Sequence, residues 1–382
     1  MSCIIDIATA VPEFTIEKGD LERFYSEAAG NSDKEFFLKK LNFLNRKTSI
    51  NKRHSSIPDY NGADFELYKN GNYTASVDDR MALYKTKVLP LASTAIDKVL
   101  QQTGIASTEI THLVTVSCTG QFAPGFEFLV ARHYGLEHIE KTALNFLGCY
   151  AGVKALKQAN YIALSDPDAC VLIVCAELCS LHFYPSFSDE DMVANLLFSD
   201  GAAAVIVCGE RNRHVQDKVV LKLDNVATAI IPGSAELMTW DITSTAFRMF
   251  LSKDIVKMLQ ENIQPVIKNF LGRENGNISH WAIHPGGVKI VEAVQEAMGL
   301  NKEQLKESYD TLRDYGNMSS PTILFILKKM LDDLKSKGNL GDENIFVAAF
   351  GPGINVEMIT LACIDNSMNL ITSSSQAHAV QE

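Results

Sequence analysis

Short apolar runs alternate with amphipathic stretches along this chain of 382 residues, and the alternation predicts strands that alternate with helices. In the first part of the chain, apolar runs bounded by turn residues predict strands at 113–116, 141–147, 169–176 and 202–207. Apolar positions at helical spacing predict one helix at 124–133 and another after residue 149. This order is typical of a layered α/β protein.

The second part of the chain repeats the same style of elements. Its pattern predicts strands and helices at 280–283, 288–298, 321–335, 344–350 and 354–363. We place the boundary near Ile230, in a loop-like stretch, which divides the chain into residues 1–230 and 231–382. The polar stretch 58–79 is predicted to be an excursion from the main fold, and 373–382 to be a frayed tail.

Composition and charge exclude several classes of function. The hydrophobic fraction of 46% is ample for a large core, and the formal net charge of -11 argues against nucleic-acid binding, because such proteins present basic faces. No apolar stretch approaches the roughly 20 residues that span a bilayer. Asp6 interrupts the one N-terminal apolar run, 4–10, so no leader is predicted. The eight cysteines form no pair with metal-ligand spacing, so we expect no metal site and a cytoplasmic location.

Cys149 stands where the predicted strand 141–147 meets the helix that follows it. At a helix N-terminus, unpaired N–H groups and the positive end of the helix dipole favour a thiolate, and a neighbouring imidazolium would lower the cysteine pKa further. Gly148 allows a tight turn just before the sulfur. The residue is therefore a candidate nucleophile; the alternative is a buried structural cysteine, because free cysteine behaves as a small apolar residue.

Two downstream residues give Cys149 candidate partners. His284 ends the predicted strand 280–283 and precedes a Pro-Gly-Gly turn, a setting that suits a catalytic imidazole. Asn317 comes shortly before the predicted helix 321–335. Each residue also has a structural interpretation, as a hydrogen-bonded histidine at a strand end and as an ordinary turn asparagine.

Five motifs taken together resemble a single family. They are Gly148-Cys149-Tyr150-Ala151-Gly152, Phe198-Ser199-Asp200-Gly201, Ile283-His284-Pro285-Gly286-Gly287, Tyr315-Gly316-Asn317-Met318 and Phe350-Gly351-Pro352-Gly353. In this order, and over residues 40–362, the chain resembles the type III polyketide synthases, the chalcone synthase-like group. The resemblance implies a thiolase-like fold of two duplicated α/β halves (αβαβα layers). It also implies an acyltransferase that takes acyl-CoA and malonyl-CoA as substrates and needs no cofactor.

The chemistry of this group accounts for the residue types. A Cys149 thiolate paired with a His284 imidazolium would attack an acyl-CoA thioester and hold the acyl group. Malonyl-CoA then loses carbon dioxide, and negative charge develops on its thioester oxygen. His284 and the Asn317 amide could stabilise that charge as hydrogen-bond donors. The resulting enolate attacks the Cys149 thioester, which lengthens the chain by two carbons.

The resemblance also assigns residues around the reacting centre. Phe198 matches a gatekeeper between a CoA tunnel and the reaction cavity, and Met249 stands where the family usually has a second gatekeeping phenylalanine. The positions that match cavity walls are Thr119, Cys179, His182, Trp240, Phe247 and Ser319. The positions that match cations around the CoA phosphates are Lys40, Lys47 and Lys289, while a third N-terminal basic position holds Phe43.

Two cavity positions set our expectation for the product. Ala123 matches the residue that reaches into the cavity of the partner subunit, so a homodimer is expected, and its small side chain could open a channel for an aliphatic tail. Trp240 replaces a small residue of the plant chalcone synthases, which disfavours the flavonoid reaction. We therefore expect a fatty acyl-CoA starter and a pyrone or resorcinol-type product. For Trp240, plain core packing is the alternative.

Other functions stay open at this stage. A β-ketoacyl synthase III-like enzyme would take its substrate from a carrier protein, although the related fatty-acid synthases usually have Gln-Ala-Asn after the histidine. A hydroxymethylglutaryl-CoA synthase-like enzyme would use a glutamate as general base, for which Glu177 is the nearby candidate. A catalytically silent thiolase-fold protein could serve as a binding partner.

Overall fold

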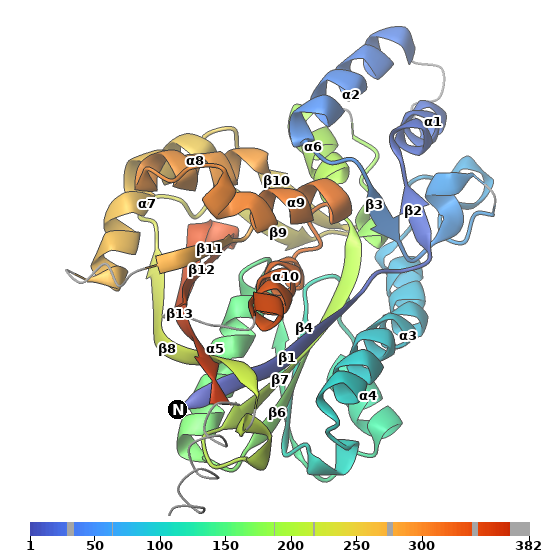
Figure 1. The fold of residues 1–382 in the computed structure, drawn as a ribbon. Helices are drawn as coiled ribbons and strands as arrows, with labels where there is room; N and C mark the ends of the chain where they lie inside the picture. Colours follow the sequence, from blue (N-terminus) through green and yellow to red (C-terminus); the bar gives the residue numbers. More distant parts are fainter. Residues whose placement is uncertain are drawn as a thin grey trace, which may run out of the picture.

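The structure, a computed structural model, describes residues 1–28, 34–62, 64–186, 188–216, 218–272, 278–337 and 343–366 (Figure 1). Its helices are α1 (Lys18–Ala28), α2 (Lys34–Thr48), α3 (Val77–Thr103), α4 (Phe126–Tyr134), α5 (Ala151–Ser165), α6 (Asp189–Leu197), α7 (Ile255–Leu271), α8 (Val288–Met298), α9 (Lys306–Tyr315) and α10 (Thr322–Lys337). No helix in the described part of the chain is long and apolar enough to cross a membrane. The predicted tail, 373–382, lies outside the described residues.

Nine strands hydrogen-bond into one sheet that folds back on itself. In spatial order they are β11 (Ile278–Ile283), β12 (Asn344–Gly351), β13 (Asn355–Asp365), β8 (Val219–Ile230), β1 (Ser2–Ala10), β7 (Asp200–Gly209), β6 (Cys170–Leu178), β4 (His112–Ser117) and β5 (Glu140–Asn145). This sheet has two halves, one from β11 to β8 and the other from β1 to β5 in the spatial order given above. They meet where β1 pairs with β8, and on β1 that pairing involves only Ser2 to Ile4. The described residues also form two small antiparallel sheets: β2 (Phe14–Ile16) with β3 (Arg53–Ser55), and the hairpin of β9 (Met238–Ile242) with β10 (Phe247–Leu251).

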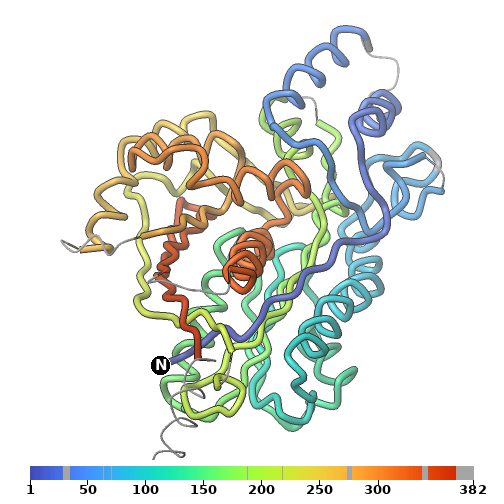
Figure 2. The backbone as a smooth tube through the Cα atoms, in the orientation of Figure 1, coloured from blue at the N-terminus to red at the C-terminus, as the bar shows by residue number. Residues whose placement is uncertain are grey.

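Side-chain alternation in the strands creates the layers. In β6, Leu172 and Val174 face an outer core with α3 and α4, whereas Val171 and Ile173 face a middle core with α5 and α10. In β12, the alternate residues face the same middle core from the other side and an outer core with α7 and α8. Figure 2 shows the two halves of the sheet on either side of α10. The predicted αβαβα architecture is confirmed.

Most strands predicted from apolar runs form within one or two residues of their expected ends, and the predicted helix 288–298 coincides with α8. Several long elements were not predicted, among them the strands β1 and β8 and the helices α2, α7 and the 27-residue α3. A capping box of Ser76 and Asp79 starts α3. The predicted boundary near Ile230 falls at the end of β8, which pairs along its length with β13 of the second half.

Two local expectations need correction. The apolar run 141–147 predicts a buried strand, but β5 is the edge of the large sheet, and its side chains are either exposed or partly buried. An edge strand has a neighbour on one side only, and no described element covers its outer side. The polar stretch 58–79 is not a detached excursion, because Tyr60, Tyr68 and Tyr73 pack around Phe24 in the outer core.

A buried ion pair ties the two halves together. Lys157 of α5 lies 2.5 Å from Glu357 of β13, and both side chains are almost fully buried. The Lys157 ammonium also donates to the Ala227 carbonyl and to the Thr228 hydroxyl. A buried charge is costly unless it is paired and hydrogen-bonded, so the pair fixes the position of α5 against the second half.

We predict that Lys157→Met lowers the free energy of unfolding by about 3–5 kcal/mol, because Glu357 loses its buried partner. The double variant Lys157→Met/Glu357→Leu should regain most of this loss. Lys154, the more exposed cation 3.3 Å from Glu357, provides the control, and Lys154→Met should cost less than about 1 kcal/mol. Urea unfolding curves measure all three changes; equal losses for Lys154→Met and Lys157→Met would contradict the prediction.

Candidate active site

Cys149 lies in a tight turn between β5 and α5. Gly148 has a φ of 86°, and a Cβ at that position would lie 2.4 Å from the ring of Pro352, so glycine is required there. The first intrahelical hydrogen bonds follow at once, from Ala151 to Gly148 and from Lys154 to Tyr150. The Cys149 thiol is buried at the N-terminal end of α5, as the sequence predicted.

Asn317 comes to this thiol from the second half of the chain. Its backbone forms two hydrogen bonds beside Phe198, with Leu197 and Ser199, and these make a short parallel bridge. Its side-chain nitrogen lies 3.9 Å from the Cys149 sulfur and 3.3 Å from the Gly286 carbonyl oxygen. The side-chain oxygen accepts the Ser319 N–H at 2.8 Å, which leaves the amide N–H groups directed toward the thiol and Gly286.

His284 ends β11, and its backbone N–H donates to the Ala348 carbonyl. The side chain is fully buried, and neither ring nitrogen has a hydrogen-bond partner among the described residues. Its ring carbon Cδ2 lies 4.0 Å from where a Cβ at Gly286 would stand, so the ring is next to the glycine that accepts from Asn317. A buried polar group without a partner is unusual in a native protein and points to a functional role.

Two cavities meet at this centre. The outer cavity has a free volume of about 250 Å³, and Cys149, Asn317 and Gly286 line it together with apolar side chains. The inner cavity has a free volume of only about 50 Å³. Phe198 and Met249 line both cavities, so the two predicted gatekeepers do stand between them.

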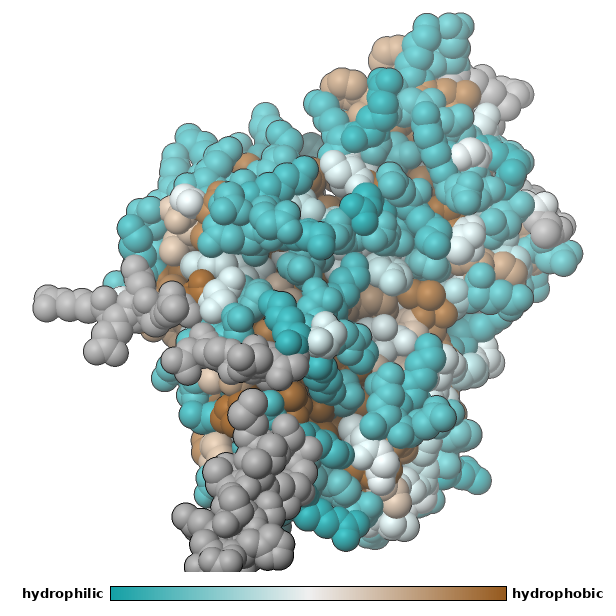
Figure 3. All heavy atoms as spheres, viewed as in Figure 1, coloured by the Kyte–Doolittle hydropathy of each residue, from teal (hydrophilic) through white to brown (hydrophobic). Residues whose placement is uncertain are grey.

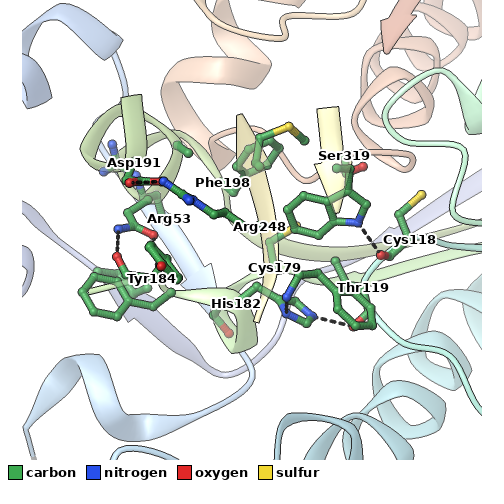
Figure 4. Close-up of a pocket in the computed structure, with 18 of the residues that line it drawn as sticks. Arg53, Cys118, Thr119, Cys179, His182, Tyr184, Asp191, Phe198, Arg248 and Ser319 are labelled. Carbon is green, nitrogen blue, oxygen red and sulfur yellow. Dashed lines mark hydrogen bonds and ion pairs between the residues drawn. The ribbon is translucent and has the colours of Figure 1, made fainter. Parts of the chain in front are cut away.

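All six predicted cavity-wall residues line the inner cavity: Thr119, Cys179, His182, Trp240, Phe247 and Ser319. Figure 4 shows several of these side chains grouped on one side of that cavity. His182 accepts a hydrogen bond from the Phe247 N–H and contacts the Thr119 carbonyl at 2.7 Å through its other nitrogen, and Trp240 donates to the Cys118 carbonyl. Burial lowers the pKa of His182 to about 3, so its ring is neutral.

The remaining predicted site residues lie further out. Lys47 and Lys289 line the outer cavity, whereas Lys40 does not and instead pairs with Asp189 at 2.5 Å. Ala123 is exposed on the loop before α4 and does not line either cavity of its own chain.

The structure adds wall residues that sequence reasoning missed. At the far end of the inner cavity, Asp191 pairs with Arg248 through two hydrogen bonds, and Tyr184 stacks against the guanidinium (Figure 4). Cys118, whose sulfur accepts the Gly148 N–H, also lines this cavity. Only its position one residue before Thr119 could have indicated it.

Family models decide the assignment. The model described as chalcone and stilbene synthases, N-terminal domain, matches residues 1–211, and the corresponding C-terminal domain matches residues 222–365. The chain belongs to the chalcone and stilbene synthase family. The enzyme class predicted from the five motifs, a type III polyketide synthase with acyltransferase chemistry, is confirmed.

Known relatives agree with this family. Type III polyketide synthase A of Arabidopsis thaliana is 31% identical over 344 residues, which cover 88% of this chain and 86% of the relative. Among solved structures, PKS-I of the brown alga Ectocarpus siliculosus has a TM-score of 0.88 at 27% identity and covers 95% of this chain and 98% of its own. CsyB, solved in complex with CoA, has a TM-score of 0.86 at 27% identity, with 95% of this chain and 100% of that chain covered.

Glu177 of this synthase holds the walls in place and is not free to act as a base. It is fully buried, and its carboxylate accepts hydrogen bonds from Ser320 on one oxygen and from Cys118 and Thr119 on the other. These donors come from both halves of the chain. Burial raises its pKa, and the hydrogen bonds oppose that effect. A hydroxymethylglutaryl-CoA synthase-like enzyme needs a free glutamate near the thiol as general base. Glu177, the candidate for this role, is engaged in these hydrogen bonds, so this alternative is disfavoured.

Burial at the N-terminal end of α5 opposes the expected Cys149 thiolate unless a partner charge accompanies it. Burial raises the pKa of the Cys149 thiol to about 11 and lowers the pKa of His284 to about 3. Loss of hydration therefore outweighs the favourable helix end, because neither group can carry its charge alone in an apolar site. A proton that moves from Cys149 to His284 creates two opposite charges together, and their attraction compensates part of that cost.

We predict that His284 accepts the Cys149 proton. In His284→Gln, the rate at which iodoacetamide alkylates Cys149 should rise about tenfold per pH unit between about pH 7 and pH 10, because the thiolate then forms only as the pH approaches the raised pKa. In the unaltered synthase the rate at pH 7 should be higher and nearly independent of pH over this interval. Mass spectrometry of the Cys149 peptide separates it from the other cysteines; identical pH profiles in the two proteins would contradict the prediction.

Proposed function

We propose that this synthase loads an aliphatic, fatty acyl group from acyl-CoA onto Cys149, extends it with malonyl-CoA and closes the product as a pyrone or resorcinol-type polyketide. The observation that carries the proposal is the arrangement at Cys149, where the thiol and the Asn317 amide face one apolar cavity and two gatekeepers lead to a second. The family assignment supports condensation of malonyl-CoA. The choice of starter and of ring closure is inferred from the residues that line the inner cavity.

The proposed mechanism uses three side chains. The Cys149 sulfur attacks the acyl carbonyl while its proton passes to His284. The bond between the acyl carbon and the CoA sulfur then breaks, and CoA leaves as a thiolate that takes a proton from solvent, so His284 stays an imidazolium. The acyl cysteine then meets malonyl-CoA, whose carbon–carbon bond to the carboxylate breaks. The electron pair moves into the thioester carbonyl, where the Asn317 amide and His284 imidazolium can donate hydrogen bonds to the oxygen. The enolate carbon attacks the acyl cysteine and displaces its sulfur.

Phe198 and Met249 support the decarboxylation step in a second way. Apolar groups between the two cavities withhold solvation from the malonyl carboxylate, so conversion to uncharged carbon dioxide is favoured. Methionine is more flexible than the phenylalanine expected at the second position, so this gate adapts to chains of different width.

The inner wall supports an aliphatic starter. Three polar groups on the Trp240 side of this cavity already have protein partners: the His182 ring, the Trp240 N–H and the Thr119 hydroxyl. A phenolic starter would leave its hydroxyl without a partner, and that costs binding energy in a buried site. The inner cavity has about 50 Å³ of free volume against about 250 Å³ in the outer cavity, so we expect a long tail to require the wall to move.

We also propose a homodimer in the cytoplasm, with Lys47 and Lys289 at the CoA phosphates and no cofactor beyond the CoA substrates. The exposed loop of Ala123 and the uncovered edge of β5 support an interface on that side. All eight cysteines are free, which supports a reducing compartment.

The deciding experiment supplies malonyl-CoA and a panel of acyl-CoAs, from acetyl to palmitoyl and including one aromatic starter, and identifies products by mass spectrometry. We expect pyrones or resorcinols from aliphatic starters, none from Cys149→Ala, and decarboxylation of malonyl-CoA that is about 100- to 1000-fold slower in Asn317→Ala. Products only with a carrier-protein substrate would favour the ketoacyl synthase alternative. No acyl transfer with any donor would favour the silent binding protein.

Trp240 should limit the length of the product. Replacement by glycine removes the indole from the inner wall, so we expect Trp240→Gly to accept longer starters or to add at least one more malonyl unit. Trp240→Phe, which keeps an aromatic ring, is the matched control and should retain the original product lengths. Chain lengths are read from the same mass spectra; an unchanged distribution in Trp240→Gly would mean that the indole does not bound the growing chain.

A further inference from the structure

Helix α2 exposes a large aromatic side chain, Phe43, of a kind that proteins usually bury. Phe43 is 49% exposed, whereas Phe37 and Leu41 of the same helix are buried in the outer core. Figure 1 shows α2 projecting from the body of the molecule beside α6. The surface seen in Figure 3 is largely hydrophilic. A single exposed ring is common in proteins, so the neighbours of Phe43 must carry the argument.

The first neighbour is Lys47, one helical turn after Phe43. Its ammonium nitrogen lies 4.0 Å from the centroid of the Phe43 ring, a cation–π contact. Lys47 also lines the outer cavity, together with Leu44 and Thr48 of the same helix. The exposed ring and the cavity that holds Cys149 are therefore joined through one cation.

The second observation concerns another helix that lines the same cavity. Lys289 lies in the first turn of α8, and it lines the cavity with Gly287 and Val288. The free N–H groups at the start of this 11-residue helix add positive potential to the lysine. Cations from two separate helices thus line one cavity of a protein with net charge -11, which makes this cavity a local attractor for an anionic ligand.

We propose that Phe43 is a stacking platform for the adenine ring of the CoA substrates. This inference rests on the proposed function, in which CoA thioesters reach Cys149 through the outer cavity. With the thioester at Cys149, the pantetheine arm runs along the apolar walls and the diphosphate lies between Lys47 and Lys289. The adenine is then outside the cavity, next to the α2 face that carries Phe43. Lys47 contacts one face of the ring, and the adenine takes the other.

The chemistry of the pair suits this role. An aromatic side chain stacks on a nucleobase through its π-face, and such a contact is sensitive to removal of the ring. Lys47 is then shared between the ring and the diphosphate, so the phosphate contact and the stacking contact support each other. The site selects substrates that carry the nucleotide over those with the same acyl group on a shorter thiol.

The test compares substrates with and without the nucleotide. In Phe43→Ala, we expect KM for malonyl-CoA and acyl-CoA to rise about 5- to 20-fold with kcat unchanged. KM for the corresponding N-acetylcysteamine thioesters, which lack the nucleotide, should stay the same. Phe43→Trp should restore or lower KM for the CoA substrates. Adenosine 3′,5′-bisphosphate should inhibit the unaltered synthase competitively and should inhibit Phe43→Ala less strongly.

Phe36 of the same helix supplies the matched control, because it is 68% exposed and does not line the outer cavity. Phe36→Ala should leave every KM unchanged. The proposal is overturned if Phe43→Ala changes KM equally for both substrate classes, or for neither. It is also overturned if Phe36→Ala and Phe43→Ala both leave KM unchanged and both weaken sedimentation with phosphatidylserine vesicles, since α2 is then a membrane-binding face. Failure of the proposed function itself would show separately, as no product from the unaltered synthase with either class of thioester.

Discussion

The close approach of α5 and α10 in the middle layer is the constraint on which the site depends. Gly152, in the first turn of α5, is so near the start of α10 that an added Cβ would lie 2.3 Å from the Ser320 carbonyl oxygen. Because a glycine stands there, the turn with Cys149 can meet the turn with Asn317. Glu177 secures the arrangement by accepting hydrogen bonds from Ser320 and from Cys118 and Thr119. The reacting groups thus come from opposite halves of the chain and are held by backbone contact.

This arrangement also determines the electrostatics of the reaction. The middle layer is closed by apolar side chains from both halves of the sheet, so the thiol and the imidazole lose their hydration together. A charge on the thiol or on the imidazole alone is disfavoured. Two opposite charges on these groups, or a charge on a bound substrate beside them, interact strongly because little water screens them. The unpartnered nitrogens of His284 and the amide of Asn317 fit the proposed mechanism, in which they stabilise charge that exists only during the reaction. Such preorganisation is what a decarboxylating condensation needs.

The two cavities divide the recognition of substrates. The outer cavity has cations at Lys47 and Lys289 with apolar walls between, which suits a long polar carrier that ends in phosphates. The inner cavity is bounded by His182, which stacks on Phe247, and by Trp240, which meets Phe247 edge-on. The His182 ring and the Trp240 N–H already have protein partners. In the proposed function, binding of the carrier and selection of the acyl chain are therefore separate properties of different surfaces. Phe198 and Met249, which line both cavities, couple the two.

The sequence by itself determined the family and the layered α/β class, because these depend on local patterns. The same patterns predict Cys149, His284 and Asn317 as the reacting residues. Apolar runs define strands wherever both faces are buried, and the motifs around Cys149, His284 and Asn317 contain the glycines and turn residues that local geometry requires. Tertiary structure decided what depends on distant neighbours. Only the sheet order makes β5 an edge strand, and only packing buries the tyrosines of residues 58–79. Burial also raises the pKa of Cys149, so the expected thiolate depends on a partner charge and not on the helix end alone.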